Sequence, residues 1–166
     1  MAYSSGKIKI PNVTGNIVIT VKAIAEKVKN ILLESFTYGG VPYDAVDFLD
    51  NTKLNTSGGE DALNGSTATK GYVPCTAGVD TIYIKGFQPG TSGTSGYSIV
   101  FYKDVNTWLT GSYFYVRSHS YYTLSDEGDG LYKLTVAYSG CKYIRFNLPC
   151  ANGGANAVIT INQPPS

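Results

Sequence analysis

The densest run of β-forming residues in the chain is Tyr97–Asp104. Aromatic and β-branched residues follow one another there almost without interruption, and the run stops at the turn-prone Asp104-Val105-Asn106. Because the run is apolar on both faces, we expect a strand near the centre of a sheet that is covered on both sides. The rest of the fold is predicted to be built around this strand.

Shorter segments with alternating or aromatic patterns surround the central run. They predict strands at 71–74, 81–87, 108–110, 113–117, 121–124, 131–138, 142–148 and 157–162. Turn signals at near-regular intervals between such strands predict an all-β fold, an antiparallel β-sandwich or jelly roll. The polar segment 46–59 is expected to be irregular structure that wraps the core, and the Gly- and Ser-rich segment 88–96 is expected to be a loop.

The N-terminal residues 6–25 alternate in two stretches, which predicts a β-hairpin with strands at 7–10 and 17–23. Two strands alone are marginally stable in water. We therefore expect the hairpin to lean on the main domain, on another subunit or on sequence before Met1. The predicted organisation is a hairpin at 1–25, a linker at 26–43, a β-sandwich at 44–162 and a tail at 163–166.

Composition agrees with this picture and narrows the function classes. The 166 residues suit one domain, and 14 Tyr, 19 Gly and 15% charged residues suit a turn-rich β protein. A net charge of +1 gives no electrostatic basis for binding nucleic acid or an anionic membrane. The apolar runs are too short to cross a bilayer as a helix. Low charge with abundant Tyr, Asn, Ser and Gly is typical of recognition surfaces.

Catalytic and metal-binding patterns are weak. The single histidine, His119, lacks a G-x-S-x-G partner motif, and most acids lie in turn segments, so we expect no enzyme activity. The acidic run 126–130 predicts a hairpin turn rather than a calcium loop. The cysteines Cys75, Cys141 and Cys150 form no metal motif and are predicted to be buried small hydrophobes. A strand of about eight residues would hold Cys141 and Cys150 too far apart to bridge. We expect no cofactor and no metal.

Aromatic residues supply the candidate binding site. Alternation puts Tyr113, Tyr115 and Arg117 on one face of the predicted strand 113–117. Sugars stack their C–H faces on such rings, while their hydroxyls need polar partners. The predicted ligand-binding residues are Trp108, Tyr113, Tyr115, Arg117, His119 and Asn106. The alternative, that these tyrosines are half-buried sandwich residues or subunit contacts, stays open.

Two stretches carry a family resemblance. The phrase IKIPNVTGNIVITVKA resembles the closing hairpin of small immunoglobulin-like repeats in bacteriophage tail and bacterial surface proteins. Over about 46–162, the ordered phrases LDNTKLNTSGGEDA, GYVPCTAGVDTIYIKG, YSIVFYKDVNTWLTG, LTVAYSGCKYIRFNL and AVITIN resemble a domain recurrent in tail and baseplate proteins of phages of Gram-positive gut bacteria. The chain departs from that family at Lys53, where Arg is usual, and at Lys103, which separates a usual Tyr-Asp pair.

The resemblance implies a galactose-binding-like, carbohydrate-binding β-sandwich with a structural or host-attachment role and no catalysis. The expected function is a non-catalytic binding module of a phage tail or baseplate protein that recognises a bacterial surface saccharide. The expected partners are that saccharide and other tail subunits, in a homo-oligomer such as a trimer. The expected location is the virion tail, or the cell surface or exterior for a bacterial protein. Two alternatives are a purely structural or oligomerisation domain and a carbohydrate-binding appendage of a secreted bacterial enzyme.

Overall fold

The computed structural model describes residues 2–4, 7–9, 14–15, 28–87, 98–112, 117–148 and 156–165. The regular elements within these ranges are β-strands, and the strand pairs among them are antiparallel. In the same ranges, no helix has the length and apolar character needed to span a membrane.

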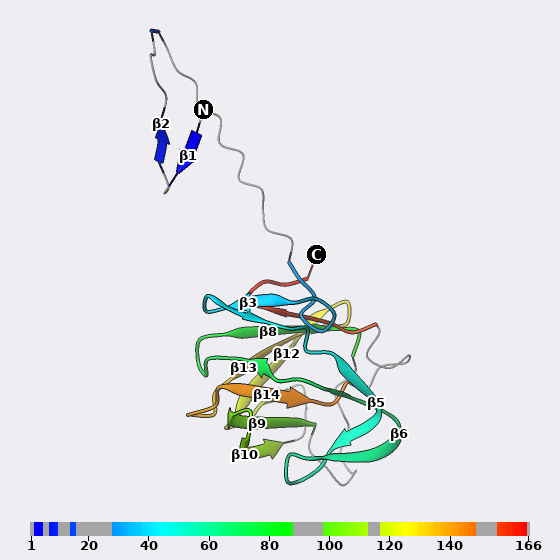
Figure 1. The fold of residues 1–166 in the computed structure, drawn as a ribbon. Coiled ribbons are helices and arrows are strands. Elements are labelled where there is room, and N and C mark those ends of the chain that lie inside the picture. Colours follow the sequence, from blue (N-terminus) through cyan, green and yellow to red (C-terminus); the bar gives the residue numbers. More distant parts are fainter. Residues whose placement is uncertain are drawn as a thin grey trace.

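Two sheets form the body of the molecule (Figure 1). The four-stranded sheet has the order β10 (Thr107–Ser112), β9 (Ile99–Asp104), β14 (Tyr143–Phe146) and β7 (Val73–Pro74). The five-stranded sheet has the order β11 (Arg117–Ser118), β12 (Tyr122–Gly128), β13 (Leu131–Val136), β8 (Thr81–Lys85) and β16 (Val158–Ile161). The prediction of an all-β antiparallel sandwich is confirmed, whereas the jelly-roll connectivity stays a prediction.

The core lies between the two sheets and follows from alternation along each strand. In β8, Ile82 and Ile84 are buried while the residues between and beside them are partly exposed. Full burial of each such aliphatic side chain contributes about 1.5–3 kcal/mol. The fully buried core residues of the two sheets include Val73, Ile99, Phe101, Ile144, Phe146, Ile82, Ile84, Tyr122, Leu124, Leu134 and Ile159.

The central strand behaves as the sequence predicts. β9 lies between β10 and β14, and its first four residues are all buried. Ile99 and Phe101 belong to the core between the sheets. Val100 and Tyr102 face the other way, into a second apolar cluster with Leu54. When both faces of a strand are covered, every side chain lies in an apolar environment, which explains the unbroken apolar run of β9.

The cover over that second face corrects the sequence prediction for 46–59. This polar segment is not irregular: β5 (Phe48–Leu54) and β6 (Glu60–Thr69) form a long antiparallel hairpin. Its pairing contains a bulge between Asp50 and Thr52, at Asn51, which has a left-handed φ of 50°. Most of the hairpin is exposed or only partly buried, so its sequence lacks apolar alternation. A bulge also breaks the period of two that would reveal a strand.

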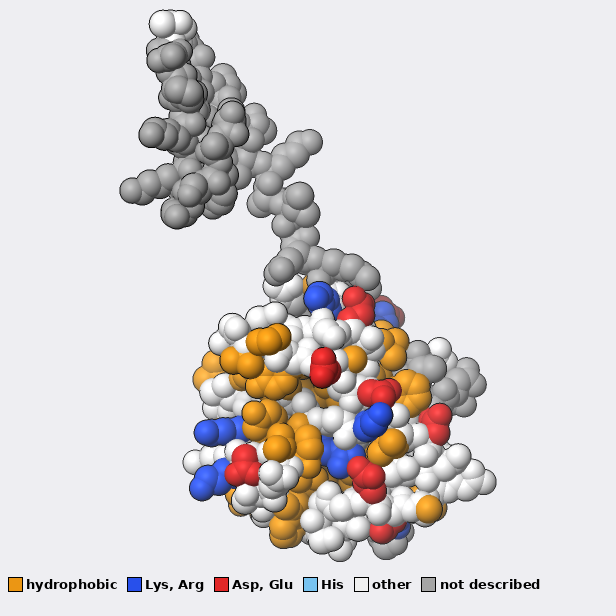
Figure 2. All heavy atoms as spheres, in the orientation of Figure 1, with side chains coloured by type: hydrophobic (Ala, Val, Ile, Leu, Met, Phe, Trp, Pro, Cys, Tyr) orange, Lys and Arg blue, Asp and Glu red, His pale blue; other side chains and the backbone are white. Residues whose placement is uncertain are grey.

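The predicted linker also differs from the structure. Ile31, Leu32 and Phe36 are buried in the main core, and the Ile31 amide donates to the Ile159 carbonyl at 2.9 Å. Phe36 starts the short hairpin of β3 (Phe36–Tyr38) and β4 (Val41–Tyr43). Figure 1 shows this hairpin across one end of the sandwich, where hydrophobic side chains also reach the surface (Figure 2). The sandwich therefore includes residues 30–36, which precede the predicted domain start at residue 44.

At the N-terminus, β2 (Lys7–Lys9) pairs with β1 (Ala2–Ser4). The predicted partner strand at 17–23 and the predicted loop at 88–96 lie outside the described residues. β12 extends through part of the predicted turn at 125–130, and the chain reverses at Asp129 and Gly130, which have φ angles of 51° and 70°. The predicted hairpin turn therefore forms within the acidic run 126–130, at its last two residues.

Candidate functional site

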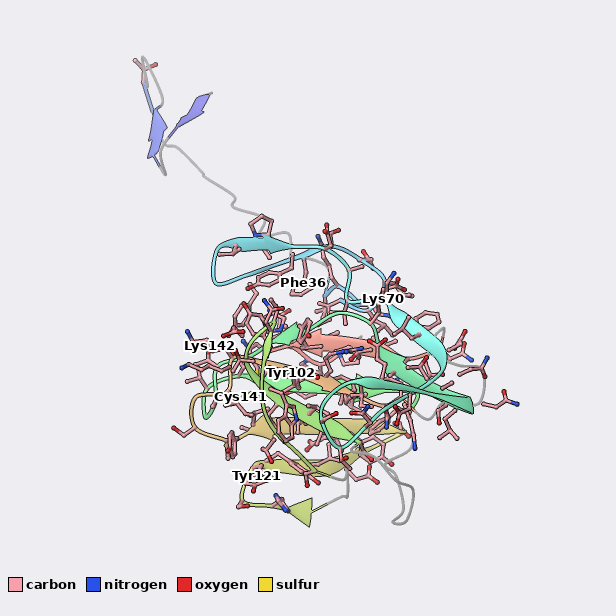
Figure 3. The ribbon with its side chains drawn as sticks, turned by 60° about the horizontal axis from the view of Figure 1, so that its bottom comes forward. Phe36, Lys70, Tyr102, Tyr121, Cys141 and Lys142 are labelled. Atoms are coloured by element: carbon pink, nitrogen blue, oxygen red, sulfur yellow. The ribbon has the colours of Figure 1, made fainter. Side chains whose placement is uncertain are left out.

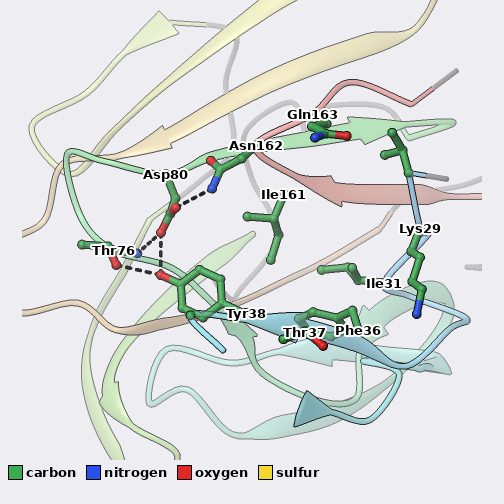
Figure 4. Close-up of a pocket in the computed structure, with 12 residues that line it drawn as sticks. Lys29, Ile31, Phe36, Thr37, Tyr38, Thr76, Asp80, Ile161, Asn162 and Gln163 are labelled. Carbon is green, nitrogen blue, oxygen red and sulfur yellow. Dashed lines mark hydrogen bonds between the residues drawn. The ribbon is translucent and has the colours of Figure 1, made fainter. Parts of the chain in front are cut away.

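A cleft with a volume of about 560 Å³ lies beside the β3–β4 hairpin. Three segments that are distant in the sequence form its walls (Figure 4). They are residues 28–39 including β3, the turn at 76–80, and the end of β16 with Asn162 and Gln163. The hydrogen bond from Ile31 to Ile159 holds the first of these segments against the last.

Asp80 is the polar centre of this cleft and is only 6% exposed. Its Oδ2 accepts a hydrogen bond from the Tyr38 hydroxyl at 2.6 Å and one from the Thr76 amide at 2.5 Å. Its Oδ1 accepts a hydrogen bond from Asn162 Nδ2 at 2.7 Å. One carboxylate thus ties β3, the 76–80 turn and the end of β16 together, which satisfies the requirement that a buried charge be hydrogen-bonded.

These contacts determine the protonation of the site. Burial raises the pKa of Asp80, but the hydrogen bonds from Tyr38, Asn162 and Thr76 outweigh burial, and the net pKa is lowered. Burial and the bond to Asp80 raise the pKa of Tyr38 to about 12. At neutral pH the cleft therefore presents a carboxylate held by a phenol that remains a proton donor.

The orientation of Asn162 follows from its place at the end of β16. Its backbone has a left-handed φ of 61°, a conformation that asparagine tolerates better than most residues. Its amide donates to the Thr81 carbonyl at 2.7 Å, and its Oδ1 accepts from the Thr81 amide at 2.9 Å. With Oδ1 occupied in this way, Nδ2 is directed at Asp80.

A second cleft of about 390 Å³ adjoins the first and shares Tyr38 and Thr76 with it. Tyr43 and Tyr143 add two more rings to its walls. The Tyr43 ring stands edge-on to Tyr38 with centroids 6.3 Å apart, and it stacks on Phe36 at 5.3 Å. The β3–β4 hairpin thus carries a row of aromatic rings along both clefts.

This arrangement suits a neutral, polyhydroxylated ligand. Aromatic rings offer flat apolar faces, while Asn162, Gln163 and the exposed Lys29 offer polar atoms at the cleft walls. A pocket of this size accommodates small ligands, for which about 300–1,000 Å³ is usual. Within the described part of the chain, no group of three or more His, Cys, Asp and Glu residues is placed to hold a metal ion.

Those residues of the predicted glycan platform that the structure describes lie elsewhere. Trp108 is 41% exposed on β10, and Asn106 is exposed in the turn before it, where its amide donates to Asp104 Oδ1 at 2.9 Å. His119 is partly buried, and its Nδ1 accepts a hydrogen bond from the Tyr121 amide at 3.3 Å. Tyr113, Tyr115 and the side chain of Arg117 lie outside the described part of the structure.

The structure does not bring Trp108 and His119 together. Trp108 is the cross-strand partner of Tyr102 and packs against Gly58, on the outer face of the four-stranded sheet. The His119 ring stacks on Tyr122, which faces Phe101 in the core between the sheets. Opposite faces of one sheet separate the two side chains. The remaining members of the set stay predictions.

Sequence reasoning missed the residues that form the clefts. Tyr38 falls in the predicted linker and Asn162 at the last position of a predicted strand, and no prediction covers Asp80. The one available signal was the buried-type run Ile31-Leu32, which argues against a solvated linker. Nothing in the linear pattern joins positions 38, 80 and 162.

Comparisons of the chain with protein-family models, with curated proteins and with solved structures found no match. A function for this chain is therefore inferred from the clefts themselves and from the resemblance of the five ordered phrases. Of these two, the clefts can be examined atom by atom.

Proposed function

We propose that this chain is a non-catalytic saccharide-binding module whose site is the pair of clefts beside the β3–β4 hairpin. The observation that carries the proposal is the meeting of aromatic rings with a fixed polar network at Tyr38, Asp80 and Asn162. A sugar would lie against the rings of the hairpin and exchange hydrogen bonds with the polar rim. Because the network is already formed, binding would cost little ordering of the protein.

The state of Asp80 supports binding rather than hydrolysis. Glycoside hydrolysis requires a carboxylic acid with a raised pKa and a second carboxylate several ångströms away. Asp80 has a lowered pKa, and its two oxygens are engaged by three donors. Among the described residues that line the first cleft, Asp80 is the only acid. This carboxylate positions its neighbours and has no proton to donate.

The biological setting we propose is a phage tail or baseplate, with a bacterial surface saccharide as the ligand. Support for this setting comes from the resemblance of the ordered phrases between 46 and 162. The clefts support only the chemical class of the ligand, a neutral saccharide. A net charge of +1 gives the chain no preference for a polyanion.

Binding of purified chain to capsular and cell-wall saccharides of Gram-positive bacteria, measured by calorimetry, tests the proposal. Thr37 lines the first cleft and is exposed, so Thr37→Trp would fill the cleft without disturbing the core. We expect this variant to weaken binding at least about tenfold, the equivalent of 1.4 kcal/mol. Thr123→Trp is the matched control, because Thr123 is an exposed strand residue that lines none of the described clefts.

The outcomes separate the competing sites. Loss of binding in Thr37→Trp but not in Thr123→Trp supports the cleft. Retained binding in Thr37→Trp together with loss in Trp108→Ala moves the site to the Trp108 face. If no saccharide binds the wild-type chain, the proposed function is wrong.

A subunit contact is the second candidate for this region. Val41 is 54% exposed at the start of β4, and Val79 is 73% exposed in the 76–80 turn. Both belong to segments that border the clefts, and exposed apolar residues are typical of interfaces when they cluster. Molar mass in solution by light scattering tests this candidate. A trimer that Val41→Asp and Val79→Asp convert to monomers would support an assembly role, and a monomeric wild-type chain would exclude it.

A further inference from the structure

Two cysteines meet at the floor of the second cleft. Cys75 and Cys141 are each 3% exposed and unbridged, and their Sγ atoms lie 4.0 Å apart. Both residues line the second cleft. Two sulfur atoms at this separation are in van der Waals contact, with no other side chain between them.

The backbone fixes this juxtaposition. Cys75 directly follows β7, and its amide donates to the Lys142 carbonyl at 2.9 Å. Tyr143 pairs with Pro74 in the same register. Lys142 lies opposite Cys75 in this register, and Cys141 is the next residue, so the two sulfurs meet where the regular pairing of β7 and β14 ends. Rotation of the two side chains toward each other would bring the sulfurs to the bonding distance of about 2.05 Å.

We propose that Cys75 and Cys141 are a reversible thiol–disulfide pair that small-molecule disulfides oxidise. The proposal is independent of saccharide binding, because it rests on the two sulfurs and their backbone supports alone. Its predicted product is an intramolecular bridge between the end of β7 and the turn that precedes β14.

Cys141 is the cysteine of the pair that a disulfide reagent reaches first. It lies between the exposed residues Gly140 and Lys142, and Figure 3 shows Cys141 and Lys142 side by side at one side of the sandwich. The hydrogen bond with Cys75 lowers the pKa of Cys141, since the Cys75 thiol can donate to a Cys141 thiolate. The same contact and burial raise the pKa of Cys75. Thiolate character therefore develops at Cys141.

The chemistry balances as two successive exchanges. The Cys141 thiolate attacks one sulfur of oxidised glutathione, which forms a mixed disulfide and releases one glutathione thiolate. That thiolate takes the proton of the Cys75 thiol. Cys75 then attacks Cys141 Sγ, so the mixed disulfide breaks and the second glutathione leaves. Two protein thiols have been oxidised and one molecule of oxidised glutathione has been reduced to two thiols.

Closure would constrain the chain between two residues that are 66 positions apart. A loop of that length lowers the entropy of the unfolded chain enough to raise Tm by roughly 9–17 °C, unless strain in the folded state offsets it. The bridge would also fix the floor of the cleft between β7 and the 138–142 turn.

The test uses the full chain, reduced and then equilibrated in glutathione buffers of increasing oxidised fraction. Free thiols are blocked with N-ethylmaleimide after acid quenching and denaturation, and intact mass and peptide mapping follow. We expect a species that has lost two reactive thiols, carries no glutathione and yields a Cys75–Cys141 linked peptide. It should have a higher Tm, and dithiothreitol should reverse both changes.

The Cys150→Ser variant removes the third thiol, and it should behave like the wild type. Cys141→Ser should show no cross-link. Three results would overturn the proposal: both thiols remain alkylated at every glutathione ratio, the product holds mixed disulfides without a bridge, or the bridge involves Cys150. The wild-type measurement decides the question even where a variant fails to fold.

Discussion

Replacing Asp80 by asparagine tests the polar centre of the cleft with almost no change of shape. The substitution removes the charge and converts one acceptor oxygen into an NH2 group. If the amide nitrogen takes the place of Oδ2, it faces the Tyr38 hydroxyl at 2.6 Å and the Thr76 amide at 2.5 Å. The Thr76 amide then has no acceptor. The flipped rotamer instead turns the amide nitrogen toward the donor Asn162.

The magnitude follows from the number of bonds affected. A hydrogen bond to a charged group contributes about 1.5–3 kcal/mol, and a buried donor left without a partner costs about 1–3 kcal/mol. One donor is lost and the others become neutral pairs, so we expect Asp80→Asn to lower the free energy of unfolding by about 2–4 kcal/mol near pH 7. Asp129→Asn is the control, because Asp129 is exposed in a turn with a φ of 51° that asparagine also adopts.

The pH dependence gives a sharper signature. The pKa of Asp80 is lower in the folded chain than its unfolded value of about 3.9, so the unfolded state binds the proton more readily. Its contribution is fully present above the unfolded pKa and is lost as the pH falls through the folded pKa. The difference between wild type and Asp80→Asn should therefore be largest near neutrality and should shrink as the pH falls below about 4.

Urea unfolding of wild type, Asp80→Asn and Asp129→Asn at several pH values measures these differences. Taking the difference between variants removes the contributions of all other acids. A gap of the same size at pH 7 and pH 3 would refute the assignment of a depressed pKa to Asp80. A gap below about 0.5 kcal/mol at pH 7 would refute its role as the centre of the network.

Two further perturbations test the packing around β9 by chemical unfolding and tryptophan fluorescence. Gly58→Ala should destabilise the chain more than Gly65→Ala. Both glycines have left-handed φ angles, of 80° and 77°, so the backbone strain is similar. The two sites differ in their surroundings, because a Cβ at Gly58 would overlap Trp108 Cδ1 while a Cβ at Gly65 would face open space. Gly58→Ala alone should also shift the emission of Trp108, the single tryptophan, and equal effects of the two substitutions would contradict the contact. Phe101→Ala should lower the free energy of unfolding by about 3–5 kcal/mol, because Phe101 is fully buried. The control Val105→Ala, at a residue that is 46% exposed, should change the free energy of unfolding by less than about 1 kcal/mol. Similar changes in the two variants would contradict the assignment of Phe101 to the core.

The parts of the fold that the sequence predicts are those in which burial repeats with the period of a strand. β8 buries every second residue, and β9 is buried on both faces, so both patterns are visible without a structure. The β5–β6 hairpin is invisible to the same reasoning. Its buried residues are Leu54 and Thr67–Thr69, of which two are threonines, and a bulge interrupts its register.

The site could not be predicted for a different reason. Its three central residues lie at positions 38, 80 and 162, and each has an ordinary local explanation as a linker, turn or strand-end residue. Only the antiparallel register of β16 with β8, together with the docking of residues 28–38, brings them within hydrogen-bonding distance. Aromatic content favours the segment 106–119 as a binding site, but its described side chains Trp108 and His119 lie on opposite faces of a sheet.

Three of the phrases that carry the family resemblance also meet in space, and their contacts explain what such phrases encode. The Leu54 amide donates to Asn147 Oδ1 at 3.0 Å, and Arg145 Nε donates to the Thr69 carbonyl at 3.1 Å. The Arg145 guanidinium also lies over the Tyr72 ring at 5.6 Å. These side chains fasten the β5–β6 hairpin to the outer face of the four-stranded sheet.

The contacts that join the β5–β6 hairpin to β14 are therefore contacts of packing, although the phrases also contain the cleft residues Asp80 and Asn162. Among the described residues that line the first cleft, none belongs to the contacts that join the β5–β6 hairpin to β14. A chain could keep these packing contacts and change Tyr38, Asp80 and Asn162, and it would then retain the sandwich while losing the polar network. Among such chains, the fold would follow the packing contacts and ligand preference would follow the hairpin and the two strand ends that surround it.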